Sequence, residues 1–248
     1  MIAPAAAVLG LVVGSFLNVV IYRVPRRRSV VWPVSRCPKC GEPIAPKDNI
    51  PLVSYLLLRG RCRKCGERIS MRYPLIEALT ALLFGAAVYK FGVGIQLISA
   101  FVLIAALISL AAIDLEHGIL PNAIIGPCAA VVFVLSVLTD PSGWWIYLIS
   151  ALAVGGGLFV LAVAYPAGMG MGDVKMGGML GAFLGPYGAQ AVFLGALCGT
   201  VVGGLLLALG RIRRRSALPF GVFMAFGGLV SLFEGQELFA LYLRLVEV

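Results

Sequence analysis

Long runs of apolar residues, separated by short polar or charged segments, make up most of the chain. These runs predict eight helices, at about Ile2–Tyr22, Leu75–Tyr89, Gln96–Ile113, Ile119–Leu138, Trp144–Tyr165, Met176–Leu184 with its extension, Ala189–Leu209 and Leu218–Phe233. Several runs approach or exceed the roughly 20 residues that cross a bilayer. They are continuous rather than alternating, which argues against a transmembrane β-barrel. We therefore expect an all-α polytopic membrane protein with about eight transmembrane helices.

One sizeable polar block interrupts this pattern and divides the chain into three parts. It covers residues 23–73 and holds most of the 20 Lys and Arg residues. We expect a first transmembrane helix at 1–22, a cytoplasmic insertion at 23–73, and a larger transmembrane domain at 74–248. The residues after 233 predict a short amphipathic helix at the membrane interface.

Composition and charge agree with a membrane protein and fix its expected orientation. Of the 248 residues, 60% are hydrophobic and 12% charged, with a mean hydropathy of +1.00, which excludes a water-soluble domain. The net charge of +9 reflects basic residues on one side of the bilayer rather than nucleic-acid binding. Threading the helices puts the N-terminus outside, Lys90 and Arg244 outside, and most other basic residues inside, including Arg211, Arg213, Arg214 and Arg215. The apolar N-terminus precedes its basic residues, so we interpret it as a retained helix rather than a signal peptide.

Two Cys-x-x-Cys units in the polar block predict a metal site. Cys37 and Cys40 form the first unit, and Cys62 and Cys65 form the second. Each unit continues with Gly-Glu, which suits a tight turn whose amides point at thiolates. Four cysteines in two such turns are typical of a tetrahedral structural zinc site with no open ligand position. A cytoplasmic location argues against disulfides.

Two aspartates are the candidate catalytic groups. Asp114 ends the third predicted helix, and Asp173 ends the glycine-rich segment after the fifth; the threading places both on the cytoplasmic face. Two carboxylates held together share a proton, so one can serve as base and the other as acid in peptide hydrolysis. Alternatively, each Asp caps a helix or pairs with a base, and Lys175 is near enough in sequence to partner Asp173. Gly170 and Gly172 would let an extended substrate backbone approach closely.

Three further polar positions leave their roles open. Glu77 either caps the N-terminus of the second helix or binds a ligand amine. Gly14, Ser15 and Asn18 share one side of the first helix, where they serve helix packing or contact a substrate. His117 is interpreted as a loop residue near Asp114 with at most an auxiliary role.

In combination these segments closely resemble the type IV prepilin peptidases, a family of intramembrane aspartyl proteases. The resemblance covers nearly the whole chain. It rests on the segment from Gly14 to Arg23, the two Cys-x-x-Cys units, Arg72-Tyr73-Pro74 with Glu77, the Asp114 segment with Leu120-Pro121, and Gly170-Met171-Gly172-Asp173, which looks like the family's GxGD motif. Asn122 is one departure, since many relatives carry an acidic residue there.

The resemblance implies a bacterial inner-membrane enzyme with Asp114 and Asp173 as its catalytic pair. Such enzymes remove a basic leader from type IV prepilins and type II secretion pseudopilins at the cytoplasmic face. They then methylate the new N-terminus with S-adenosylmethionine, whose binding residues the sequence does not reveal. Gly170, Gly172, Lys175 and Glu77 are expected near the substrate. The alternatives are an ion-coupled transporter with a structural zinc domain, a zinc scaffold without enzymatic activity, and a protease of the same mechanism with another substrate.

Overall fold

A computed structural model describes residues 2–166, 168–212 and 218–246, with the side chain of Val246 left out. The described part of the chain is helical apart from two isolated bridges in the polar block. It forms two compact units, residues 1–93 and 94–248. The first unit extends to residue 93 because the second long helix pairs with the first. Arg213, Arg214 and Arg215, expected inside, lie outside the described residues.

The first unit contains a pair of long helices and the polar block. Helix α1 (Ile2–Arg23) packs antiparallel against α3 (Arg72–Phe91). The contact is close because α1 presents Gly10 and Gly14 one turn apart: a Cβ at either position would meet the backbone of α3 within 2.8 Å. Asn18, one turn further, donates hydrogen bonds from Nδ2 to the carbonyls of Gly14 and Tyr73. These contacts favour the packing role for this side of α1.

The polar block is built from turns and short helices rather than a hydrophobic core. It holds the 3₁₀ turns η1 (Val24–Arg26) and η2 (Pro46–Asp48) and the single-turn helix α2 (Val53–Leu57). None of these was expected, since segments this short carry no periodic pattern. Leu52, which precedes α2, has a φ of 58°, and its N–H donates to the Glu77 carboxylate at 2.8 Å.

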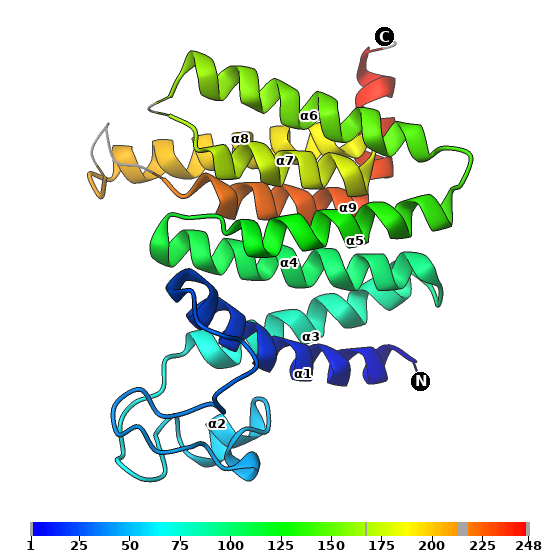
Figure 1. The fold of residues 1–248 in the computed structure, drawn as a ribbon. Coiled ribbons are helices and arrows are strands. Elements are labelled where there is room, and N and C mark those ends of the chain that lie inside the picture. The colour runs from blue at the N-terminus through cyan, green and yellow to red at the C-terminus, as the bar shows by residue number, and fades with distance from the viewer. Residues whose placement is uncertain (1, 167, 213–217, 247–248) are drawn as a thin grey trace. The chain divides into compact units, whose positions relative to one another are not determined.

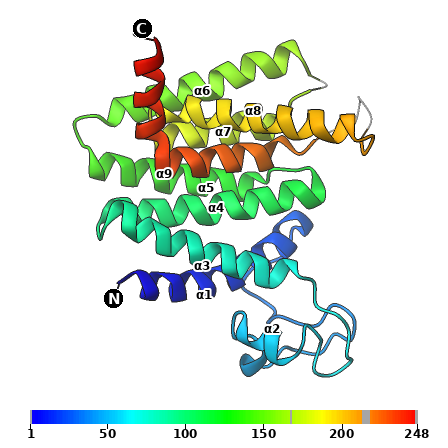
Figure 2. The ribbon, with the colours of Figure 1, turned by 180° about the vertical axis from the view of Figure 1, so that it is seen from behind.

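The second unit is a bundle of six helices that lie side by side (Figures 1 and 2). They are α4 (Ile95–His117), α5 (Asn122–Thr139), α6 (Trp144–Ala164), α7 (Met171–Leu184), α8 (Tyr187–Ala208) and α9 (Phe220–Val246). Helix α4 forms the core, with 56% of its span buried, whereas α6 and α8 are 11% buried and present apolar side chains outward. That distribution fits a bundle whose outer helices face lipid.

Seven of the described helices are long and apolar enough to cross a membrane: α1, α3, α4, α5, α6, α8 and α9. The eighth, α7, has 14 residues and a length of about 21 Å, shorter than a hydrocarbon core of about 30 Å. It packs tightly against α6, because a Cβ at Gly181 would lie 2.4 Å from the Ser150 carbonyl oxygen.

Two predicted boundaries are wrong in an informative way. Helix α7 begins at Met171 rather than Met176, so Asp173 lies in its first turn instead of in an irregular segment before it. The expected separate C-terminal helix is instead the continuation of α9, and Figure 2 shows its red end turning away from the direction of the first part.

Candidate active site

Asp114 lies in the last turn of α4 and is 7% exposed. Its Oδ2 accepts the backbone N–H of Val222, at an N···O distance of 3.3 Å. Val222 belongs to the first turn of α9, where backbone N–H groups have no partner within the helix and the helix dipole favours a negative charge. The N-terminus of α9 therefore supports the ionised form of Asp114.

Asp173 is held by the start of its own helix. Gly170 precedes α7 with extended backbone angles, and its N–H donates to Asp173 Oδ2 at 3.0 Å. This is the return bond of a capping box, in which an acidic side chain three residues into a helix reaches back to the capping residue. The glycine-rich segment thus fixes the orientation of the carboxylate.

Leu120 connects the two aspartates. A Cβ at Gly172 would lie 2.9 Å from Leu120 Cβ, and a Cβ at Gly221 would lie 2.8 Å from both Leu120 Cδ2 and Asp114 Oδ2. Leu120 therefore packs between the residue before Asp173 and the helix end that binds Asp114. The two carboxylates are close enough to interact electrostatically. Two carboxyl groups in this arrangement can divide the roles of base and acid.

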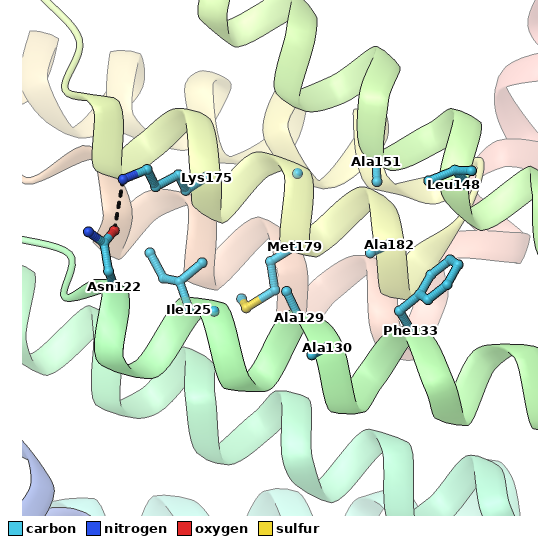
Figure 3. A pocket seen from close by; sticks show the side chains of 12 residues that line it. Asn122, Ile125, Ala129, Ala130, Phe133, Leu148, Ala151, Lys175, Met179 and Ala182 are labelled. Atoms are coloured by element: carbon cyan, nitrogen blue, oxygen red, sulfur yellow. Dashed lines mark hydrogen bonds between the residues drawn. The ribbon is translucent and has the colours of Figure 1, made fainter.

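The remaining predicted residues of this region take other partners. Lys175 does not pair with Asp173; its Nζ donates to Asn122 Oδ1 at 3.0 Å, which joins α7 to α5 (Figure 3). His117 is the last residue of α4 rather than a loop residue, and its Nδ1 is 4.0 Å from Glu116. Gly221 and Val222 were missed by the sequence analysis. The one available signal was Pro219, a residue type favoured at helix starts.

Glu77 belongs to the first unit and does not cap α3. It lies in the second turn of that helix, whose first turn contains no acidic residue. Its carboxylate accepts the Leu52 N–H and interacts with the Ser15 hydroxyl. Glu77 therefore attaches the polar block to the pair formed by α1 and α3.

The four cysteines of the two Cys-x-x-Cys units converge. The four sulfur atoms all lie within 4.8 Å of one another, and the Cys37 and Cys65 sulfurs are 3.8 Å apart. Four sulfurs at Zn–S distances of about 2.3 Å in a tetrahedron would be separated by about 3.8 Å, so this arrangement fits zinc. The N–H of Cys40 points at the Cys37 sulfur and lowers the pKa of that thiol to about 7, whereas the pKa of the Cys65 thiol in the same cluster is raised to about 11, so metal binding would have to release protons from the cluster.

The two turns that carry the cysteines repeat each other and are cross-linked reciprocally. Gly41 donates to the Cys37 carbonyl and Gly66 to the Cys62 carbonyl, both at 2.9 Å, with φ values of 72° and 71°. Lys39 of the first turn pairs with Glu67 of the second, and Lys64 of the second pairs with Glu42 of the first at 3.3 Å. Each turn thus supplies a cation and an anion to the other.

Comparisons with known proteins cover both units. Residues 8–91 match the bacterial peptidase A24 N-terminal domain, and residues 101–209 match the type IV leader peptidase family. Proteins named prepilin leader peptidase/N-methyltransferase are similar over most of the chain. The relative from Burkholderia pseudomallei strain 1026b is 35% identical, over 95% of this chain and 86% of its own length. The relative from Bacillus subtilis strain 168 is 33% identical, over 96% of both.

A third relative, from Myxococcus xanthus, is 45% identical over 84% of this chain and 64% of its own length. No solved structure gives a significant match. The carboxylate pair lies in the segment that matches the peptidase model, and the cysteine cluster lies in the segment that matches the N-terminal model. The chain therefore belongs to the type IV leader peptidase family and is a multi-pass bacterial membrane peptidase.

Proposed function

We propose that this protein removes the leader from type IV prepilins and pseudopilins with the Asp114–Asp173 pair, and that it then methylates the new N-terminus. One observation carries the peptidase assignment. Two aspartates from different helices are held near each other by Leu120, and each is fixed by a backbone N–H through one carboxylate oxygen. Family membership supplies the substrate class.

The chemistry follows from the shared proton of such a pair. The ionised carboxylate takes a proton from water, whose oxygen then adds to the scissile carbonyl carbon, while the protonated carboxyl donates to the carbonyl oxygen. Collapse of the tetrahedral intermediate breaks the C–N bond, and the leaving amine takes a proton from the pair. The bound N–H groups of Val222 and Gly170 leave one oxygen of each carboxylate for these transfers.

The reaction is proposed to take place at the cytoplasmic face of the inner membrane, with the N-terminus of the chain outside. The support is the distribution of basic residues, which gather in the polar block between α1 and α3. Asp114 lies at the end of α4 and Asp173 at the start of α7, so both are at helix ends, the level at which an apolar substrate helix meets its polar leader.

Methylation is proposed from the names of the relatives, and S-adenosylmethionine would supply the methyl group.

The cysteine cluster would hold a structural zinc ion that stabilises the polar block, since few apolar side chains are buried there. Gly170 and Gly172 are proposed to lie beside the substrate backbone, and Glu77 to act by holding the polar block in place.

The assignment is tested with purified protein, a prepilin, and S-adenosylmethionine. Cleavage after the leader is expected for the native chain, whereas Asp114→Asn and Asp173→Asn are each expected to lose about 100- to 10,000-fold in kcat, the contribution of a general acid or base. Mass spectrometry of the mature N-terminus reports methylation. Full cleavage by either folded variant would refute the pair. The alternative of an ion-coupled transporter has no support in the comparisons.

A further inference from the structure

A long apolar groove runs along the second unit between α5, α6 and α7, with a volume of about 610 Å³ (Figure 3). It extends on α5 from Asn122 to Phe133, which is about 16 Å at about 1.5 Å per residue. Small residues form much of its lining: Gly126, Ala129, Ala130, Ala151, Gly178 and Ala182. In a membrane, small residues let a second helix approach closely, whereas large ones hold it away.

The groove has one polar end, and that end is adjacent to the candidate active site. Lys175 and Asn122 are hydrogen-bonded there, while the other lining residues are apolar. Lys175 is two residues from Asp173, and Asn122 is two residues from Leu120, which packs against Gly172. The polar end of the groove therefore lies two residues along the chain from Asp173, and the groove continues along α7 and along α5 and α6, which are long enough to span a membrane.

The charge at this end restricts what can enter. Among the described residues, Lys175 has the neutral amide of Asn122 as its partner and no carboxylate within salt-bridge distance. An ammonium group at the mouth of an apolar groove repels a basic peptide. A substrate with a basic leader and an apolar helix would thus place its helix, and not its leader, in the groove.

We propose that the groove between α5, α6 and α7 seats the apolar membrane helix of the prepilin substrate, about three turns of it following the scissile bond. This inference rests on the proposed function, because it takes the substrate to be cleaved beside Asp173. The apolar lining, the length, the continuity with Asp173 and the charge of Lys175 all agree with this occupant. A lipid acyl chain is the competing occupant that the experiment must separate.

The test narrows the groove at a position with free space. A Cβ at Gly126 would meet no atom within 4 Å, so the side chain of Gly126→Leu starts in open space and adds bulk to the lining of the groove. Gly156→Leu is the matched control: it is also a helical glycine with free space, on α6, and it does not line the groove. Each variant is assayed on a full prepilin and on a peptide that ends shortly after the scissile bond.

For Gly126→Leu we expect kcat/KM to fall by about tenfold or more on the full prepilin and to stay unchanged on the short peptide. The control Gly156→Leu should cleave both substrates as the native chain does. Equal loss on both substrates, or no loss on either, would overturn the inference. Failure of the native chain to cleave either substrate would instead refute the proposed function.

A second measurement does not depend on cleavage. A photoreactive amino acid replaces Ala130 or, as control, Gly156 in the Asp173→Asn background, and the protein is irradiated with prepilin in lipid vesicles. The inference expects prepilin adducts from position 130 and not from position 156. Adducts with lipid alone at position 130 would show that the groove holds an acyl chain and would overturn it.

Discussion

Gly172 offers the sharpest test of how the two aspartates are positioned, because the three atoms nearest to a Cβ at this position all belong to Leu120. In Gly172→Ala the new Cβ would lie 2.9 Å from Leu120 Cβ, whereas carbon atoms in contact are normally about 3.5–4.0 Å apart. Relief requires a displacement of about 0.6–1.1 Å. Leu120 Cβ is attached to the backbone, so rotation of the side chain cannot provide it, and the start of α7 must move with Asp173.

The cost of that displacement can be estimated. A misplacement of about 1 Å can lower activity about 100-fold, so kcat/KM for prepilin cleavage should fall about 10- to 100-fold, or about 1.4–2.7 kcal/mol in transition-state stabilisation. Stability should change less, because overpacking costs about 1–3 kcal/mol while Gly→Ala in a helix returns about 0.5–1 kcal/mol. The assay is steady-state cleavage, with the thermal unfolding midpoint measured on the same preparation.

Two further variants decide the interpretation. Gly168→Ala is the matched control in the same segment, because its Cβ would meet only the Tyr165 carbonyl oxygen at an ordinary 3.6 Å. Leu120→Gly removes the clashing Cβ together with the packing between the two helix ends, so alone it should also lower kcat/KM, and the double variant with Gly172→Ala should lose less than the product of the two single losses. If Gly172→Ala cleaves as well as the native chain, or if Gly168→Ala loses as much, Leu120 does not position the pair.

Two predictions concern the polar block. Cys37→Ser and Cys62→Ser should each lower the zinc content of the purified protein, measured by elemental analysis, and its thermal unfolding midpoint. The control Cys128→Ser lies outside the cluster and should retain zinc. Equal zinc content in all three variants would refute the site. Leu52→Gly should stabilise the zinc-loaded protein by about 1 kcal/mol. The φ of 58° costs a non-glycine residue about 1–3 kcal/mol, and the greater conformational entropy of glycine in the unfolded chain offsets about 0.5–1 kcal/mol of the gain. Leu58→Gly, where φ is −85°, should destabilise it; the opposite order would show that Leu52 is unstrained.

The helices could be predicted from the sequence because a membrane span needs a long apolar run, and the described spans follow those runs within a few residues. The start of α7 could not, since residues 168–173 hold three glycines and no apolar periodicity, and the helix is capped there by the bond from Gly170 to Asp173. Likewise, the continuation of α9 past Glu234 has no distinguishing pattern, because one helix can leave the apolar layer without a break.

The sequence indicates which residues are candidates for the site, but it does not indicate which groups those residues contact. The spacing of Cys37, Cys40, Cys62 and Cys65 predicts that four sulfurs converge, and they lie within 4.8 Å of one another. The role expected for Glu77 at the end of α3 was wrong, since the helix begins at Arg72 and its partner, the Leu52 N–H, lies 25 positions away. Contacts of this kind depend on tertiary packing, which local sequence does not encode.

The hydrogen bond from Val222 to Asp114 has a consequence for the order of assembly. Asp114 and Asp173 are synthesised before α9, but the N–H group that holds Asp114 enters only with that helix, 108 positions later in the chain. A nascent chain that has inserted α4 through α8 therefore carries both carboxylates without the group that orients the first. The arrangement proposed for peptide cleavage is therefore complete only when α9 has inserted.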